Sequence, residues 1–304
     1  MKDDIAAQEL CELLARRQLP TGGWSALSCS SQASVESSAL AYIVLPSDFA
    51  SARQRATQFL LAMQSANGSW PSFAGDDKDG SWTTSLVLIA LQDNIETIVH
   101  RFSGFRWLLQ SAGKESHWLW KWKFLTTDRH VRFDPNKFGW PWIPQTNSWV
   151  VPTAFSILAL NMLPGGCGFP NREHRLELGI QMLLDRACPG GGWNAGNGVV
   201  YGRRMTPHPD DTAVALLALL GRTKDPIVSA SVDQLDRIAP DLNAPWSLAW
   251  SILGLTAHGR PVKSLVERLS CWPNLDQVED TSTIAICCLA LDYPRALARF
   301  GLVV

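Results

Sequence analysis

Charged residues are scarce in this chain of 304 residues: they make up 18% of it, and the formal net charge is −1. Proteins that bind nucleic acid carry clustered positive charge, so we expect no nucleic-acid partner. The longest apolar runs are too short to span a bilayer, and the acidic segment Met1–Leu10 lacks the apolar core of a signal peptide. We therefore expect a cytoplasmic protein without a transmembrane segment.

Motifs for metals, disulfides and phosphate loops are also missing. The seven cysteines are scattered and odd in number, with no Cys-x-x-Cys spacing, and we interpret them as reduced thiols that fill core space. Gly190-Gly-Gly-Trp193 lacks the lysine of a phosphate-binding loop, and no Gly-x-Ser-x-Gly motif marks a nucleophile. The sequence predicts neither a metal site nor a bound cofactor.

Apolar residues, by contrast, make up 46% of the chain and follow helical spacing. Six amphipathic segments alternate with six that are apolar on all sides, which predicts outer helices around buried inner ones. The outer set covers 3–17, 51–65, 95–112, 171–187, 225–238 and 261–271, and the inner set covers 34–45, 81–92, 149–162, 210–221, 246–258 and 281–292. We expect an all-α protein, a single (α/α)6 toroid over residues 1–304.

The six inner segments can be aligned on a shared small residue near their starts. Three positions upstream of that residue lies one ring of side chains: Glu36, Trp82, Val151, Asp210, Trp246 and Ser282. If the inner helices stand parallel, these side chains point to one mouth of the barrel. Helices three apart then face each other, which places Glu36 opposite Asp210 and Trp82 opposite Trp246.

Two long connections lead into inner segments. Residues 113–147 are rich in aromatic side chains, Trp142 among them, and a connection of this length in a compact domain is usually functional. We expect a lid-like insertion there. The Gly-rich connection 190–209 holds Tyr201, Arg203 and Arg204. The two arginines suit either a diphosphate or a solvated surface loop.

Two heptapeptides share the pattern Gln-x3-Gly-x-Trp: Gln18–Trp24 and Gln64–Trp70. A third copy ends at Trp193 but lacks the glutamine. The pattern and the six-pair organisation resemble the terpenoid-cyclase and protein-prenyltransferase superfamily over essentially the whole chain. In that superfamily the motif is structural, and the resemblance implies that each Gln caps a helix end while it stacks on the Trp. The Asp-x-Cys of the zinc-dependent prenyltransferases is absent, so no metal is implied.

The stretch from His208 to Ala213 is similar to the Asp-x-Asp-Asp-Thr-Ala motif of class II terpene cyclases, the squalene–hopene cyclase type. The resemblance implies that Asp210 is the Brønsted acid of a protonation-initiated cyclisation, with Asp211 and His208 beside it, and His208 replaces the first Asp of the motif. The substrate would be an apolar isoprenoid, with a magnesium ion only if it carries a diphosphate. A second chain or a homodimer would cover the pocket, because class II cyclases usually have two toroids.

Carbocation chemistry also needs aromatic faces, and tryptophan offers the best cation–π surface. We therefore expect the substrate to contact a set of residues at the mouth: Glu36, Trp82, Trp142, Trp149, Tyr201, Trp246 and Trp250.

Two other functions fit the same residues. An (α/α)6 glycoside hydrolase or lyase would use Glu36 and Asp210 as its acid–base pair across the barrel. A non-catalytic protein that binds an apolar ligand would use the carboxylates as helix caps, since Asp is a common residue in the first turn of a helix.

Overall fold

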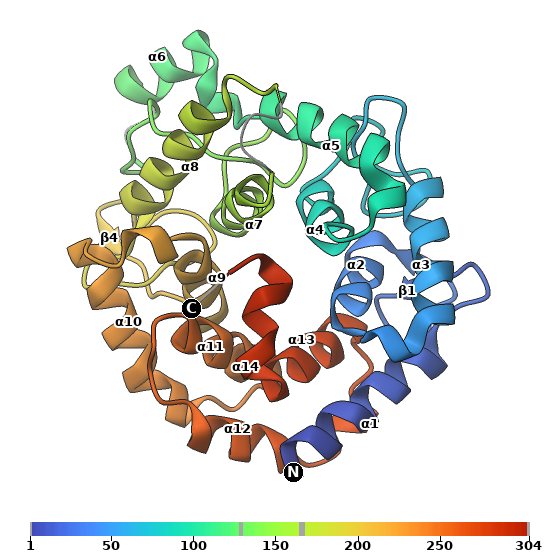
Figure 1. Cartoon of the computed structure of the whole chain (residues 1–304). Helices are drawn as coiled ribbons and strands as arrows, with labels where there is room; N and C mark the ends of the chain where they lie inside the picture. Colours follow the sequence, from blue (N-terminus) through green and yellow to red (C-terminus); the bar gives the residue numbers. More distant parts are fainter. Residues whose placement is uncertain (1, 128–129, 164–167, 303–304) are drawn as a thin grey trace.

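The structure is a computed structural model in which residues 2–127, 130–163 and 168–302 are described. Six inner helices pack side by side in a closed ring, each against the next and the last against the first (Figure 1). They are α2 (Val35–Val44), α4 (Thr83–Ala90), α7 (Val150–Asn161), α9 (Pro209–Ala218), α11 (Pro245–Ala257) and α13 (Thr281–Leu291).

An outer ring of helices surrounds them, one for each inner helix: α1 (Lys2–Arg17), α3 (Ala50–Ala62), α5 (Ile98–Gln110), α8 (Arg172–Arg186), α10 (Pro226–Ile238) and α12 (Lys263–Ser270). The predicted (α/α)6 toroid is confirmed. The only strands among the described residues form two short hairpins, β1 (Trp24–Ser25) with β2 (Ala33–Ser34) and β3 (Val199–Val200) with β4 (Arg203–Arg204). No helix in these ranges is long and apolar enough to cross a membrane.

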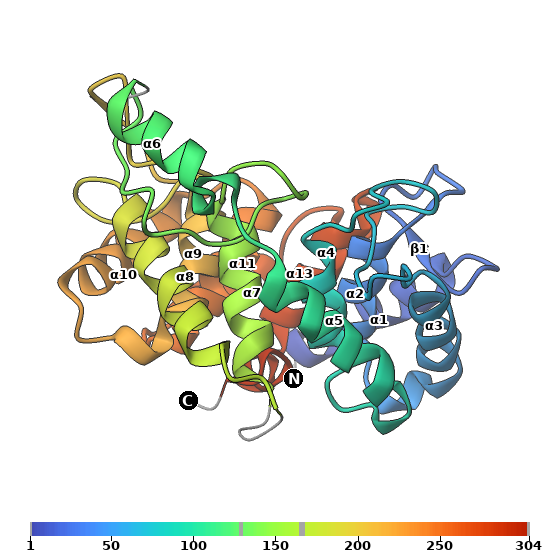
Figure 2. The same cartoon turned by 90° about the horizontal axis from the view of Figure 1, so that it is seen from above.

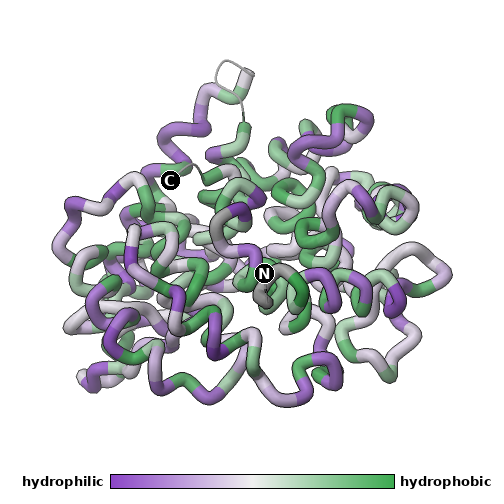
Figure 3. Tube along the Cα trace, turned by 60° about the horizontal axis from the view of Figure 1, so that its bottom comes forward, coloured by the Kyte–Doolittle hydropathy of each residue, from purple (hydrophilic) through white to green (hydrophobic). Residues whose placement is uncertain are grey.

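Burial separates the two rings as the hydropathy pattern predicts. Every residue of α4 and of α13 is buried. Outer helix α10 instead buries one stripe at helical spacing: Val228, Ser231, Val232 and Leu235. Hydrophilic and hydrophobic residues alternate along the outer helices in Figure 3. An inner helix is therefore stabilised by burial on all sides, whereas an outer helix keeps one hydrated face.

A buried tryptophan sits in the turn between an outer helix and its inner partner in four of the six pairs. Each indole N–H donates a hydrogen bond of 2.6–2.8 Å to a carbonyl of the preceding outer helix: Trp24 to Leu14, Trp70 to Leu60, Trp140 to Leu108 and Trp193 to Leu183. Each backbone N–H of these residues donates to a hydroxyl of the following inner helix: Ser38, Thr84, Thr153 and Thr212. The tryptophan thus joins the two helices of a pair.

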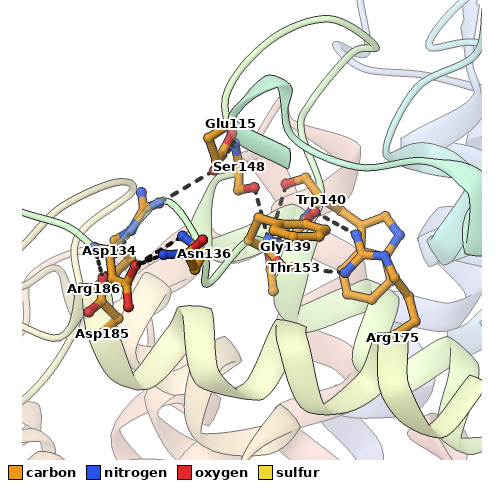
Figure 4. Close-up of polar contacts among 11 residues, drawn as sticks. Glu115, Asp134, Asn136, Gly139, Trp140, Ser148, Thr153, Arg175, Asp185 and Arg186 are labelled. Atoms are coloured by element: carbon orange, nitrogen blue, oxygen red, sulfur yellow. Dashed lines mark hydrogen bonds and ion pairs between the residues drawn. The ribbon is translucent and has the colours of Figure 1, made fainter. Parts of the chain in front are cut away.

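The motif glutamines join one pair to the next. In each complete copy the side-chain amide donates two hydrogen bonds of 2.8 Å, one within its own turn and one to the next outer helix: Gln18 to Gly22 and Ala52, and Gln64 to Gly68 and His100. In the turn of Trp140 an arginine of α8, Arg175, takes this place. It donates to the carbonyls of Ser111 and Gly139, and its guanidinium lies 3.5 Å from the Trp140 ring centroid (Figure 4).

The insertion at 113–147 contains a helix, α6 (Trp118–Thr126), which the sequence analysis did not predict. A buried ion pair anchors the start of the insertion. Glu115 lies 3.4 Å from Arg186 of α8 and accepts hydrogen bonds from the Ser148 N–H (Figure 4). Both charged side chains are almost fully buried, so loss of one would leave the other unpaired in the interior.

The C-terminal segment covers one end of the barrel, which the sequence did not indicate. Helix α14 (Tyr293–Ala296) and a 3-10 turn, η7 (Leu297–Phe300), cross the ring in Figure 1. Phe300 is buried with its ring 6.2 Å from that of Trp250, and the Arg299 carbonyl accepts a hydrogen bond from Gln92, just after α4. This is the end formed by the C-termini of the inner helices, so the mouth at their N-termini is the other one.

The cysteine prediction was correct only in part. Of the cysteines in the described part of the chain, Cys11, Cys188, Cys287 and Cys288 are buried free thiols. Cys29 and Cys271 are exposed, because they lie in turns outside the packed helices. Cys167 lies outside the described residues.

Gly68, in the second motif copy, lies where one helix pair packs closely against the next. Gly68 has φ +92°, and a Cβ there would lie 2.5 Å from the Ser103 carbonyl oxygen of α5, whereas Gly75 has φ +81° with no atom within 4 Å. We expect Gly75→Ala to cost about 1 kcal/mol for its backbone conformation alone. Gly68→Ala is expected to cost at least about 2 kcal/mol more because of the added clash. Urea unfolding of both variants measures this difference, and equal losses would contradict it.

Candidate active site

A cavity of about 200 Å3 opens at the N-terminal mouth of the inner ring. Five of the six ring positions line it together: Glu36, Trp82, Val151, Asp210 and Trp246. The sixth, Ser282, lines an adjoining hollow that also includes Glu36 and Trp246. Helix α2 stands opposite α9 in the ring, and α4 stands opposite α11, so the two carboxylates and the two tryptophans approach the cavity from opposite walls.

Glu36 lies in the first turn of α2, where Ser34 caps the helix. Burial raises the pKa of its carboxyl to about 7, and the nearby negative charge of Asp280 adds to this shift. No hydrogen bond or ion pair within the described chain offsets the loss of water around it. Glu36 is thus a carboxyl group that keeps its proton close to neutral pH.

Asp210 is placed differently. It lies in the first turn of α9, which begins with Pro209, and its Oδ2 accepts a hydrogen bond of 3.1 Å from the Trp246 indole N–H. The site therefore pairs Glu36, whose pKa is raised by burial, with Asp210, which accepts a hydrogen bond from an indole.

Asp211 and His208 form a pair beside this site. His208 Nδ1 lies 2.8 Å from Asp211 Oδ2. Burial raises the pKa of Asp211 to about 6, although the His208 contact opposes the shift. Asp211 lines the cavity, but the His208 side chain is 56% exposed and is not among the lining residues. His208 thus contacts a cavity residue without lining the cavity itself.

Aromatic rings form most of the remaining cavity wall. Trp82 meets Trp142 edge to face with ring centroids 5.0 Å apart, and Trp246 meets Trp250 in the same way at 5.8 Å. Phe155 of α7, which the sequence analysis did not single out, packs between Trp82 and Trp250 at 5.6 and 5.9 Å. Phe155 comes four residues after the ring residue Val151, so it lies one turn below the ring on the same helix face.

The adjoining hollow of about 290 Å3 is rich in hydroxyl groups. Its lining includes Phe73, Trp246 and Ala26 as well as five polar residues: Ser34, Ser37, Ser72, Ser282 and Asp280. Glu36 forms part of both hollows, of which the second has more hydroxyl groups. Apart from Ser282, the sequence analysis had not identified these polar residues as part of a site, because single serines at helix starts normally indicate capping.

Two predicted contact residues lie elsewhere. Trp149 is not among the residues that line the cavity and packs instead near Gly196 of the following connection. Tyr201 lies on the β3–β4 hairpin and is 74% exposed. Arg203 and Arg204 of the same hairpin are also exposed, which fits a surface loop. Among the described residues, no group of three or more His, Cys, Asp or Glu side chains could hold a metal ion.

A scan against protein-family models finds no match, and neither does a search of curated proteins. Solved structures do match. An alpha-amylase from Clostridium perfringens is 10% identical, with 95% of this chain and 97% of that one covered and a TM-score of 0.64. The GH76A alpha-1,6-mannanase from Salegentibacter sp. HEL1_6 is 10% identical, with 98% and 100% covered and a TM-score of 0.64.

A type II terpene cyclase, MstE from Scytonema, also matches, at 18% identity over 75% of this chain and 62% of that one. The TM-score of this match is 0.47. At these identities the likenesses show a shared toroid fold and no activity. They support the toroid part of the predicted superfamily and leave the terpene-cyclase assignment without structural support.

The raised pKa of Glu36 has a consequence for stability. Folded Glu36 holds a proton between pH 4.5 and about 7 that the unfolded chain has released. Its contribution to the free energy of unfolding is therefore fully present below pH 4.5 and is lost as the pH rises through about 7. The side chain of Glu36→Gln stays neutral at every pH. We therefore expect the free energy of unfolding of this variant to fall by roughly 2 kcal/mol less than that of the unmodified chain as the pH rises.

Urea unfolding at about pH 5 and about pH 8 measures the decline in both proteins. Glu96→Gln is the matched control, because the Glu96 side chain is exposed on the outer surface. Its pH dependence should equal that of the unmodified chain. An identical pH dependence for Glu36→Gln would show that Glu36 is already ionised in the fold.

Proposed function

We propose that this protein is an acid–base enzyme that cleaves a glycosidic bond, with Glu36 as general acid and Asp210 as general base. One observation carries the proposal: two carboxyl groups, one of them with a raised pKa, come from opposite inner helices and line one aromatic cavity. Inverting glycosidases use such a pair, in which the acid protonates the leaving oxygen and the base activates a water on the other side.

The surroundings of the two carboxyl groups suit these roles. With a pKa of about 7, Glu36 is protonated in about half of the molecules at neutral pH, and that form can give its proton to a departing sugar oxygen. Asp210, hydrogen-bonded by the Trp246 indole and set in the first turn of α9, remains an acceptor. The resemblance to class II cyclases implied the opposite assignment, with Asp210 as the acid.

The two hollows beside Glu36 supply what a carbohydrate needs. Tryptophan faces such as those of Trp82 and Trp246 stack on the apolar faces of sugar rings, and the serine-lined hollow offers hydroxyl groups for sugar hydroxyls. A glycosidic oxygen at Glu36 would have one sugar ring in each hollow. The solved toroid structures of similar shape include enzymes described as an amylase and a mannanase, which agrees with this substrate class.

The aromatic wall favours a second candidate, protonation-initiated cyclisation of an isoprenoid. Trp82, Trp142 and Trp250 would stabilise carbocations through their ring faces. The resemblance assigns the acid of this function to Asp210. Protonation of an alkene demands a strong acid, and Glu36 is poorly suited to that role because the burial that raises its pKa makes it a weaker acid. A glycosidic oxygen is far more basic than an alkene and accepts a proton from such a carboxyl.

Purified protein is to be incubated with a panel of soluble glucans, mannans and uronic-acid polymers. We expect new reducing ends with inverted anomeric configuration by NMR, or an unsaturated product by ultraviolet absorbance if the bond is broken by elimination. Glu36→Gln and Asp210→Asn should each lower the rate by at least roughly a hundredfold, because each removes one partner of the proton transfer.

Asp48→Asn, at an exposed position before α3, is the matched control and should keep the full rate. A parallel incubation with squalene-type and prenyl-diphosphate substrates is followed by mass spectrometry. Cyclic products that disappear in Asp210→Asn would replace the glycosidase proposal with the second candidate. Glycan cleavage that survives in both carboxylate variants would refute the assigned acid–base pair.

A further inference from the structure

Helix α6 presents an apolar face to solvent. Trp118, Leu119, Trp122 and Leu125 are 71%, 48%, 58% and 51% exposed. Their spacing of one, three and three residues places them along one side of the helix. None of them lines the cavity of the candidate active site. Large apolar side chains that gather on one exposed surface normally mark an interaction site.

Positive charge accompanies this face. Lys121 and Lys123 lie on the same helix, and the segment from Ser116 to Thr127 contains no acidic residue. The exposed β3–β4 hairpin adds Arg203 and Arg204, again without an acidic residue between Gly198 and Thr206. The local charge thus contrasts with the net charge of −1 of the whole chain.

The helix and the hairpin form one surface. Just after α6, Val131 pairs with Val200, and the His130 ring stacks on that of Tyr201 with centroids 5.1 Å apart. Tyr201 and Met205 of the hairpin are 74% and 41% exposed and extend the apolar area. In Figure 2 this surface, here called the α6 patch, stands out from the barrel on the side away from α14, which is the side of the cavity mouth.

We propose that the α6 patch binds the surface of a lipid bilayer that contains anionic phospholipids. Tryptophans and leucines on one side of a helix enter the boundary between headgroups and acyl chains, while the flanking lysines and arginines bind the anionic headgroups. The proposal is independent of the reaction assigned to the cavity. It does place the mouth of the barrel next to the membrane.

Two other occupants fit the patch less well. A polysaccharide would stack on the tryptophans, but Leu119 and Leu125 beside them offer no hydrogen bonds to sugar hydroxyls. A second copy of this chain, bound through the same patch, would bring lysines and arginines of like charge opposite one another. Of the three occupants, only an anionic bilayer would interact favourably with both the leucines and the positively charged side chains.

The full chain is tested by co-sedimentation with vesicles of phosphatidylcholine alone and of equimolar phosphatidylcholine and phosphatidylglycerol. We expect binding to the anionic vesicles that weakens with added salt, and little binding to the neutral ones. Trp118→Ser with Trp122→Ser, and separately Lys123→Glu with Arg204→Glu, should each lower the partition coefficient at least about tenfold.

Matched controls carry the same kinds of change on other outer surfaces. Ile95→Ser with Val99→Ser removes two side chains that are 79% and 72% exposed near α5, and Lys224→Glu with Lys263→Glu reverses two exposed charges near α10 and α12. Both controls should bind like the unmodified chain. The circular dichroism spectrum of each variant is compared with that of the unmodified chain to check that the variant is folded.

The absence of binding to anionic vesicles would overturn the proposal, and so would an equal loss of binding in the control variants. Retention on insoluble glucan that depends on Trp118 and Trp122 would assign the patch to carbohydrate. Sedimentation equilibrium that shows a dimer lost in the Trp118→Ser, Trp122→Ser variant would assign it to a second copy.

Discussion

The hydrogen bonds of a buried tryptophan fix the turn between an outer and an inner helix, and the rest of the structure depends on that turn. The indole N–H of Trp24, Trp70 or Trp193 reaches back to the outer helix, and the backbone N–H reaches forward to a hydroxyl of the inner one. A buried carbonyl or N–H without a partner would cost about 1–3 kcal/mol, so each turn has little freedom. In these pairs the tryptophan thus fixes the inner helix relative to its outer partner, and first-turn side chains of five inner helices line one cavity.

Convergence alone does not give the carboxylates different roles; their surroundings do. Among the described residues Glu36 has no hydrogen-bond or ion-pair partner, and burial together with the negative charge of Asp280 raises its pKa. Asp210, in the first turn of α9, accepts a hydrogen bond from the Trp246 indole N–H. Two similar groups at equivalent ring positions thus have different surroundings, and the proposed acid–base function depends on that difference.

The two ends of the barrel are also different. The C-terminal segment that ends at Phe300 covers one end, with Phe300 against Trp250 at the base of the cavity. The opposite end carries the long connections, and the Glu115–Arg186 pair holds the start of the insertion against α8. A ligand therefore reaches Glu36 from the end at which the α6 patch stands out, so that any surface bound by the patch lies near the entrance.

Local patterns in the sequence determined the toroid, the alternation of its helices and the ring that brings Glu36, Trp82, Asp210 and Trp246 together. These properties follow from helical periodicity and from a register that repeats in each pair. The tertiary structure alone decided that burial raises the pKa of Glu36, that Tyr201 faces solvent, and that a C-terminal segment covers the far end. Desolvation, solvent exposure and long-range packing depend on residues far apart in the chain, and no local pattern records them.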